Sequence, residues 1–183
     1  MGVVIVMNIT SSRNLPKAKS SSFTLVELLV VISIIGLLAG LGLPAINGAI
    51  QAGKKAEVAA MAESIKTAVN AFYAEYSAYP SNTSGKTDKT FLDLMSTTNT
   101  NGGNSRGIAF LEVPPKFTNG NGIVTPGGFC QNKAQSNFFL AIDTNGSGVL
   151  TTNVGGSNYV IPSSVAVWVV DPKNSKKPVG TFK

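Results

Sequence analysis

The chain has 183 residues, 43% of them hydrophobic, and it carries 15 lysines and arginines against 9 acidic residues. This length suits one domain together with one membrane helix. The absence of histidine excludes a His-based catalytic triad and a histidine metal site, and the single cysteine, Cys130, excludes a disulfide within the chain. Because no nucleophile is paired with a base, we expect the protein not to be an enzyme.

Residues 1–22 are predicted to be a leader peptide. They include three basic residues, Arg13, Lys17 and Lys19, and no acid comes before Glu27. Basic flanks stay in the cytoplasm, so the C-terminal part of the chain is expected outside it. Without the leader the chain is only slightly basic, and its lysines are scattered. Counterion-driven binding needs a clustered basic face, so no nucleic-acid partner is expected.

An apolar run extends from Phe23 to Leu43. Its 21 residues would form a helix about 31 Å long, close to the hydrocarbon thickness of a bilayer. Glu27 lies inside this run. A carboxylate within the bilayer costs about 2.5–3.5 kcal/mol, so Glu27 is expected either to meet a positive partner or to reach the headgroups.

The start of this run carries a family resemblance. The string is Phe23-Thr24-Leu25-Val26-Glu27-Leu28-Leu29-Val30, with a basic leader before it and Pro44 one helix span later. It resembles the N-terminus of the type IV pilin-like family, which comprises type IV pilins and the pseudopilins of type II secretion. Many pilins of the family carry a disulfide, so its absence favours pseudopilins or disulfide-free pilins. Within the family the chain looks most like a type II secretion major pseudopilin.

The resemblance implies how the N-terminus is processed. A prepilin peptidase would cut between Ser22 and Phe23, the new Phe23 amine would be methylated, and the apolar helices would pack in a filament core. The family usually has glycine where this chain has Ser22. The resemblance also implies a partner for Glu27, namely the Phe23 amine of a neighbouring subunit. The resemblance implies that Phe23, Glu27 and Pro44 act in assembly.

Beyond the apolar run, hydrophobic residues recur with the period of a helix. They are Val58, Met61, Ala62, Ile65, Val69, Phe72 and Tyr76. This spacing predicts an amphipathic helix over residues 45–79. Pro44 is predicted to kink the helix without stopping it, and Pro80 to end it. One long helix, about 24–78, is therefore expected.

The remainder is predicted to form a small sheet with loops. A short helix is expected at residues 88–95, capped by Asp88. Strands are expected at 108–113, 137–142, 149–152 and 164–170, with residues 143–148 as a hairpin connection between the middle two. Trp168 is expected on a central strand, residues 114–135 in an irregular surface loop, and Lys173, Lys176 and Lys177 in a solvated tail.

A possible calcium site lies in the connection at 143–148. Asp143, Asn145 and Ser147 offer oxygen ligands at alternate positions before a glycine, as in the first half of a calcium loop. An EF-hand would need an acid at Val154, so that class is excluded. Major pseudopilins commonly bind one calcium in the C-terminal region, and Asp171 is a possible further ligand. A plain Asn-Gly turn is equally well supported.

The predicted fold class is α+β and pilin-like, with a long N-terminal helix packed on a small, mostly antiparallel sheet. Residues 1–22 would be the leader, 23–44 the transmembrane and assembly half of the helix, and 45–183 the globular domain. The resemblance implies a structural subunit of a type II secretion pseudopilus or a type IV pilus. The subunit would cross the inner membrane once and then enter a periplasmic or cell-surface filament.

The resemblance further implies three kinds of protein partner: identical or related pilin subunits, the prepilin peptidase and an inner-membrane assembly platform. Two alternatives remain. One is a minor pilin with an adhesive or DNA-handling role. The other is an uncut, single-pass membrane-anchored binding domain.

Overall fold

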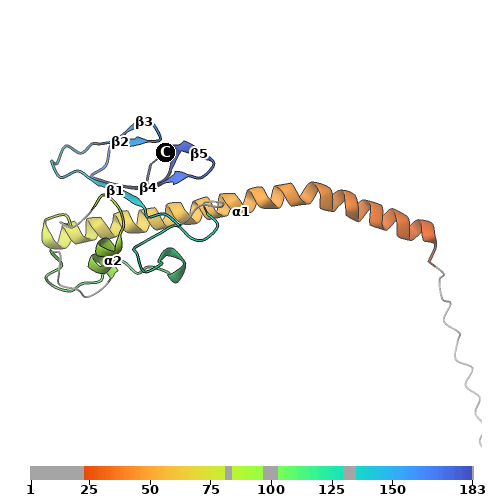
Figure 1. Ribbon diagram of the computed structural model, residues 1–183, viewed down its shortest axis with the longest axis horizontal. Coiled ribbons are helices and arrows are strands. Elements are labelled where there is room, and N and C mark those ends of the chain that lie inside the picture. The colour runs from red at the N-terminus through yellow and green to blue at the C-terminus, as the bar shows by residue number, and fades with distance from the viewer. Residues whose placement is uncertain (1–22, 81–83, 97–102, 130–134, 183) are drawn as a thin grey trace, which may run out of the picture. The chain divides into compact units, whose positions relative to one another are not determined.

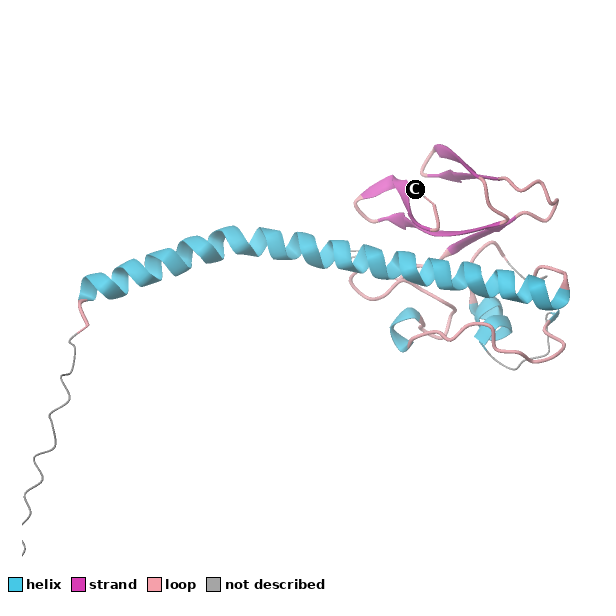
Figure 2. Cartoon of the chain, turned by 180° about the vertical axis from the view of Figure 1, so that it is seen from behind, coloured by secondary structure: helices cyan, strands magenta, loops and turns pink. Residues whose placement is uncertain are grey.

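The computed structural model describes residues 23–80, 84–96, 103–129 and 135–182 (Figure 1). Ser22 and Cys130 lie outside these ranges, and so do the side chains of residues 43–45, including that of Pro44. The chain divides into two compact units, Met1–Pro44 and Ala45–Lys183. The architecture is α+β, as predicted, with a long N-terminal helix and small antiparallel sheets (Figure 2).

Helix α1 spans Leu25–Tyr76, and its backbone remains helical at Pro44. The predicted long helix is therefore confirmed. The helix ends where Ser77 adopts a left-handed conformation, with a φ of 52°. The Ser77 N–H donates a 2.7 Å hydrogen bond to the carbonyl of Tyr73, which is the bond of an αL C-cap. Pro80 follows shortly and cannot continue a helix.

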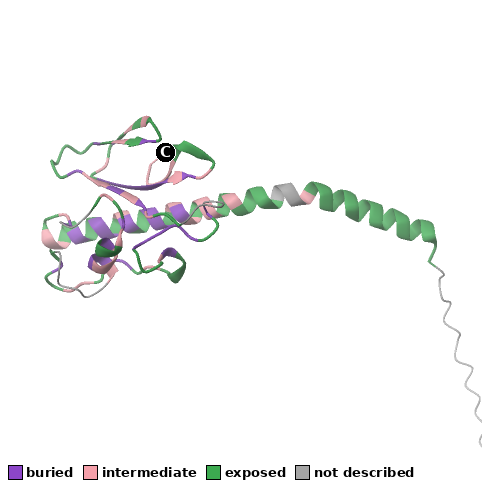
Figure 3. Ribbon diagram, in the orientation of Figure 1, coloured by how far each residue is buried: buried purple, intermediate pink, exposed green. Residues whose placement is uncertain are grey.

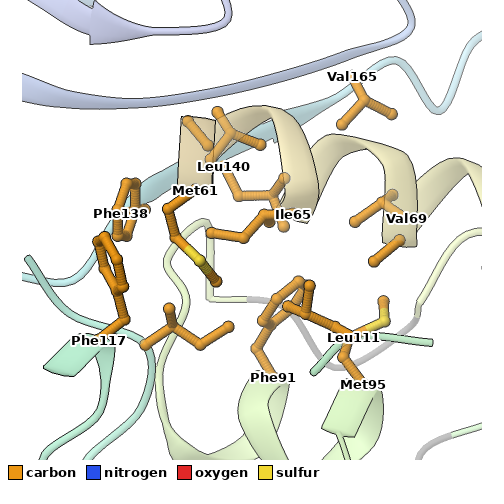
Figure 4. Close-up of a cluster of buried hydrophobic side chains, with 14 of the residues drawn as sticks. Met61, Ile65, Val69, Phe91, Met95, Leu111, Phe117, Phe138, Leu140 and Val165 are labelled. Carbon is orange, nitrogen blue, oxygen red and sulfur yellow. The ribbon is translucent and has the colours of Figure 1, made fainter. Parts of the chain in front are cut away.

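The second half of α1 supplies one wall of the hydrophobic core. Six of the seven predicted stripe residues are buried, from Val58 to Phe72, and Tyr76 is partly buried against them. Figure 4 shows Met61, Ile65 and Val69 among buried side chains from other elements. Full burial of one such side chain stabilises the fold by roughly 1.5–3 kcal/mol. The predicted amphipathic stripe is therefore confirmed as the core face.

Helix α2 spans Lys89–Ser96 and closes the core on the other side of α1 from the sheet (Figure 1). Its start is capped as predicted, because the Phe91 N–H donates a 3.0 Å hydrogen bond to the Asp88 carboxylate. Phe91, Leu94 and Met95 form its buried face.

The sheet is organised around its central strand. Strands β1 (Phe139–Ile142), β4 (Val165–Asp171) and β5 (Asn174–Gly180) form an antiparallel sheet in the order β1-β4-β5. Val165, Val167 and Val169 join the core shared with α1, whereas Ala166 and Trp168 join a second core. Burial on both faces explains the unbroken apolar run of β4. Trp168 lies on the central strand, as predicted. Its ring stacks on that of Phe139, with the two ring centroids 5.7 Å apart.

The predicted hairpin across residues 143–148 is wrong. Strand β1 pairs with β4, whereas β2 (Leu150–Val154) pairs with β3 (Ser157–Ile161) in a separate two-stranded sheet. The 143–148 connection therefore links two sheets. Strands β3 and β5 were not predicted. Strand β5 begins with four polar, exposed residues, and β3 begins with two polar residues and buries only Ile161. The apolar β4 competes better for the neighbouring position beside β1, because it buries side chains on both faces.

Two further predictions fail because loops cover the core. Residues 108–113 form no strand. Instead, the N–H groups of Phe110 and Leu111 both donate to the Met95 carbonyl, at 2.8 and 2.9 Å. The predicted surface loop at 114–135 contributes a 3-10 helix, η2 (Pro115–Phe117). It also contributes buried hydrophobic side chains, namely Phe117, Ile123, Val124 and Phe129.

A buried amide joins α1, α2 and the loop at 108. The Asn104 side chain is fully buried and accepts hydrogen bonds from the Tyr76 hydroxyl, at 2.7 Å, and the Ile108 N–H, at 3.0 Å. Its amide group donates to the carbonyls of Leu94 and Ile108, at 3.2 and 2.8 Å. Every hydrogen-bonding position of this side chain is therefore used.

Replacing Asn104 by alanine is expected to destabilise the globular unit strongly. The substitution leaves several buried donors and acceptors unpaired, at roughly 1–3 kcal/mol for each group that water cannot reach. Chemical unfolding of the purified chain in detergent would measure the loss. Asn70→Ala is the matched control, because Asn70 is exposed on α1, and such surface changes usually stay within about 0.5 kcal/mol. Equal effects of the two substitutions would contradict this account of the network.

Candidate functional sites: the exposed helix end and the 143–148 loop

The first half of α1 presents an apolar surface that is exposed among the described residues (Figure 3). Its large hydrophobic side chains from Leu25 to Leu41 are each at least 46% exposed. No charged residue occurs between Glu27 and Lys54. By length and composition, α1 is the one helix among the described residues that could cross a membrane. A continuous apolar surface of this kind marks a region that lipid or other protein covers.

Three glycines in this half of α1 have no close neighbour among the described residues outside their own helix. A Cβ built on Gly36, Gly40 or Gly42 would meet no atom within 4 Å. Glycine inside a helix costs about 1 kcal/mol relative to alanine. Gly36 and Gly40 are four residues apart and so share one face, an arrangement that lets a second helix approach closely in a membrane. The glycines therefore suit packing against something outside the chain.

Glu27 forms a capping box with Thr24 at the start of α1. The backbone N–H and the hydroxyl of Thr24 each donate a 2.8 Å hydrogen bond to Glu27 Oε2, and the Glu27 N–H donates to Thr24 Oγ1 at 3.2 Å. This reciprocal pattern satisfies backbone donors that a helix start leaves unpaired. Sequence reasoning missed Thr24, although its spacing to Glu27 is the capping-box signal.

The cap leaves part of the Glu27 carboxylate available. Both bonds from Thr24 go to Oε2, so Oε1 accepts no hydrogen bond from any described residue. Phe23 is 70% exposed and comes directly before the cap residue. The residue that follows the predicted cleavage point is therefore exposed. Ser22, which precedes it, lies outside the described residues.

The 143–148 loop closes on its own carboxylate. Asp143 accepts hydrogen bonds from the N–H groups of Asn145, at 3.2 Å, and Gly148, at 2.6 Å. The Ser147 hydroxyl donates to the Val149 carbonyl at 2.9 Å. Burial alone would raise the pKa of Asp143, but the hydrogen bonds donated by Gly148, Ser147 and Asn145 outweigh it and lower the pKa. The loop also borders a cavity of about 780 Å³ beside Tyr73 and Tyr79.

Asp171 lies apart from this loop. Asp143 follows β1 beside the start of β4, whereas Asp171 ends β4, so about 20 Å of strand separates them. Asp171 instead forms an ion pair with Lys55 of α1, at 2.5 Å, and accepts a hydrogen bond from the Lys173 N–H. Burial opposes these contacts, but together they lower the pKa of Asp171.

The predicted calcium ligands are thus only partly brought together. Asp143, Asn145 and Ser147 share the loop, without Asp171. Among the described residues, no three His, Cys, Asp or Glu side chains gather as they would around a metal ion. The hydrogen bonds describe a turn held by Asp143, and calcium binding there stays a prediction.

Comparisons with known proteins found one family and several curated relatives. Residues 17–43 match the family described as the prokaryotic N-terminal methylation motif. Over 60 residues, 33% of this chain, it is 40% identical to a fimbrial protein of Neisseria meningitidis serogroup A, covering 35% of that protein. It is 38% identical over 60 residues to the type IV major pilin protein PilE1 of Neisseria gonorrhoeae, covering 36% of it. The chain thus spans about a third of the length of these relatives. No solved structure matches the chain.

Asp143→Asn is expected to lower the midpoint of thermal unfolding in the presence of a chelator, because a neutral amide accepts hydrogen bonds from the loop N–H groups more weakly. Glu112→Gln removes the same charge from an exposed site and serves as control. If the substitution lowers the unfolding midpoint equally with chelator and with calcium, Asp143 serves only to hold the turn. A midpoint that calcium raises in the original chain but not in Asp143→Asn would demonstrate the predicted metal site.

Proposed function

The chain is type IV pilin-like at its N-terminus, and from this premise we propose that it is a structural subunit of a type IV pilus or a type II secretion pseudopilus. The observation that carries the proposal is the first half of α1, whose large hydrophobic side chains are exposed among the described residues. In the precursor the bilayer would cover this surface, and in the filament the same helices of other subunits would. The glycines at positions 36 and 40 suit such close helix packing.

The proposed maturation begins with a cut between Ser22 and Phe23 by a prepilin peptidase, followed by methylation of the new amine. It is supported by the match of residues 17–43 to the methylation motif and by the exposed Phe23. The subunit would cross the inner membrane once, with its globular unit outside the cytoplasm. It would then pass through an assembly platform and join identical or related pilin subunits. The proposed role is mechanical, without catalysis by the chain itself.

We further propose that Glu27 selects the position of an incoming subunit. A carboxylate within a bilayer costs about 2.5–3.5 kcal/mol, so a cation that meets it there contributes to assembly. The free Oε1 beside the cap can accept such a cation while Oε2 still holds Thr24. The Phe23 amine of a neighbouring subunit is the proposed cation. Glu27 would therefore both start its own helix and bind the next subunit.

Mass spectrometry and N-terminal sequencing of the protein from its native host test the processing step. We expect a chain that begins at Phe23 and carries one added methyl group. A chain that keeps residues 1–22 would contradict the proposal and would favour an uncut membrane anchor. Electron microscopy of sheared surface material and of cell envelopes, with antibody labelling of the globular unit, then tests whether the processed chain lies in filaments.

Glu27→Gln separates the two roles of Glu27. Glutamine also serves in a capping box, so this variant keeps the helix start and loses only the charge. We expect filament yield to fall by at least about ten-fold, with normal processing confirmed by mass, because the neighbouring amine then lacks its counter-charge. Thr24→Ala is the converse control, since it removes the cap and keeps the carboxylate. A larger loss in Thr24→Ala than in Glu27→Gln would show that capping, not charge, is the role of Glu27.

A further inference from the structure

This inference rests on the proposed function and concerns the globular unit, residues 45–183. One flank of α1 carries unpaired acidic residues. Glu63 of α1 and Glu112 of the neighbouring loop are exposed and have no ionic partner among the described residues. They line a shallow groove of about 440 Å³ together with Phe110 and Leu111 of the loop and the small α1 residues Ser64, Thr67, Ala68 and Ala71.

The floor of this acidic groove is smooth. Apart from Glu63, its α1 residues are all small, and the hydroxyls of Ser64 and Thr67 donate to carbonyls of α1 itself, at 3.1 and 2.9 Å. Among the α1 residues that line the groove, only the acidic Glu63 has a long side chain to meet another polypeptide segment. The other acids of α1 in this unit are already neutralised, because Glu57 pairs with Lys116 and Glu75 pairs with Arg106. The negative charge left over on this flank is that of Glu63 and Glu112.

The opposite charge is concentrated in the hairpin of β4 and β5. The basic turn comprises Lys173, in the connection, together with Lys176 and Lys177, in the first half of β5. All three lysines are exposed, and none has an acidic partner among the described residues. The nearby Asp171 already forms an ion pair with Lys55. Because β5 is the edge strand of its sheet, no further strand of that sheet covers the basic turn. Sequence reasoning treated these lysines as a solvated tail, whereas the structure places two of them in a strand.

The basic turn and the acidic groove lie on different flanks of α1. Lys55 anchors α1 to the strand that leads into the turn, whereas Ala68 and Ala71 line the groove. At about 100° per residue, these two alanines lie roughly 160–220° from Lys55 around the helix axis, whereas Glu63 lies roughly 80° from it. The basic turn and the acidic groove therefore lie on different sides of α1, and we expect them to meet between copies.

We propose that the basic turn of one subunit docks on the acidic groove of a second copy of this chain. Such a contact joins two different surfaces, and when its rotation does not close it produces an open helical filament. The groove residues 63–71 follow Lys55 by 8–16 positions, so successive subunits would be offset by roughly 12–24 Å along α1. Exposed ion pairs bind weakly, so the contact sets register and partner choice while the apolar helices hold the filament together.

Disulfide cross-linking tests the contact between copies. Lys177→Cys and Glu112→Cys are combined in a Cys130→Ser background and expressed in the native host. Mild oxidation is expected to give a ladder of species beyond the dimer, because each chain offers both halves of the contact, whereas either single variant stops at the dimer. The matched control pairs Glu112→Cys with Val160→Cys, since Val160 is 70% exposed on β3. An equal ladder from the control pair overturns the proposal.

Charge exchange provides the second readout. Glu63→Lys with Glu112→Lys is expected to lower filament yield by roughly ten-fold, and so is Lys173→Glu with Lys177→Glu, because each brings like charges together. Combining all four substitutions should restore the yield. Without restoration and without the ladder, the lysines serve another partner, such as an anionic lipid surface, and the proposal is overturned. If the original chain forms filaments in that case, the proposed function stands. An original chain that stays monomeric in the membrane overturns both.

Discussion

The exposed apolar surface of the first half of α1 is unfavourable in water. Its exposed leucines, isoleucines and valines extend from Leu25 to Leu41, and burying that many side chains is worth on the order of 10 kcal/mol or more. That figure is comparable with the entire free energy of unfolding of an ordinary domain. A chain built this way must place the helix in lipid or against other helices. Both environments are dry, and a subunit could therefore move from one to the other without exposing this surface to water.

The second half of α1 obeys the opposite rule and buries one stripe within its own chain. Val58, Ile65 and Phe72 belong to a core that also contains residues of β4 and α2. Figure 4 shows Ile65 with Val165 of β4 on one side and Phe91 of α2 on the other. Near the N-terminal end of the buried stripe, the Lys55–Asp171 ion pair fixes α1 to the end of β4. Near its C-terminal end, the hydrogen bond between Tyr76 and Asn104 fixes α1 to the Asn104 network. Within this unit, polar contacts at both ends of the buried stripe set the position of α1, and the hydrophobic stripe supplies most of the stability.

Charge is used sparingly and for position. The apolar run holds one carboxylate, that of Glu27. Its Oε2 caps the helix by accepting hydrogen bonds from Thr24, and its Oε1 accepts none from the described residues. In the globular unit, Lys55, Glu57 and Glu75 of α1 form ion pairs with residues distant in the sequence, and unpaired acids and unpaired lysines remain on different sides of α1. Separated excess charges of opposite sign favour ordered contacts between copies over contacts of a surface with itself.

Local patterns in the amino-acid sequence were enough to predict α1, its apolar half, its core stripe, the capped α2 and the buried central strand with Trp168. Each of these depends on residues close together in the chain, whose period or spacing is visible directly. The capping box of Thr24 and Glu27 belongs to the same class, although it was overlooked. The processing site and the calcium ligands also came from local motifs, and they remain predictions.

Tertiary structure alone decided which strands pair and which polar groups meet. Nothing in residues 137–152 indicates that β1 prefers β4 over β2, because that choice depends on how much apolar surface each pairing buries against α1. The polar strands β3 and β5 exist because neighbouring strands offer them hydrogen-bonding edges. Lys55 and Asp171 are 116 positions apart, and the same β4 that brings them together holds Asp171 away from Asp143. Pairings of this kind leave no periodic mark, since they arise only when distant segments pack on a common core.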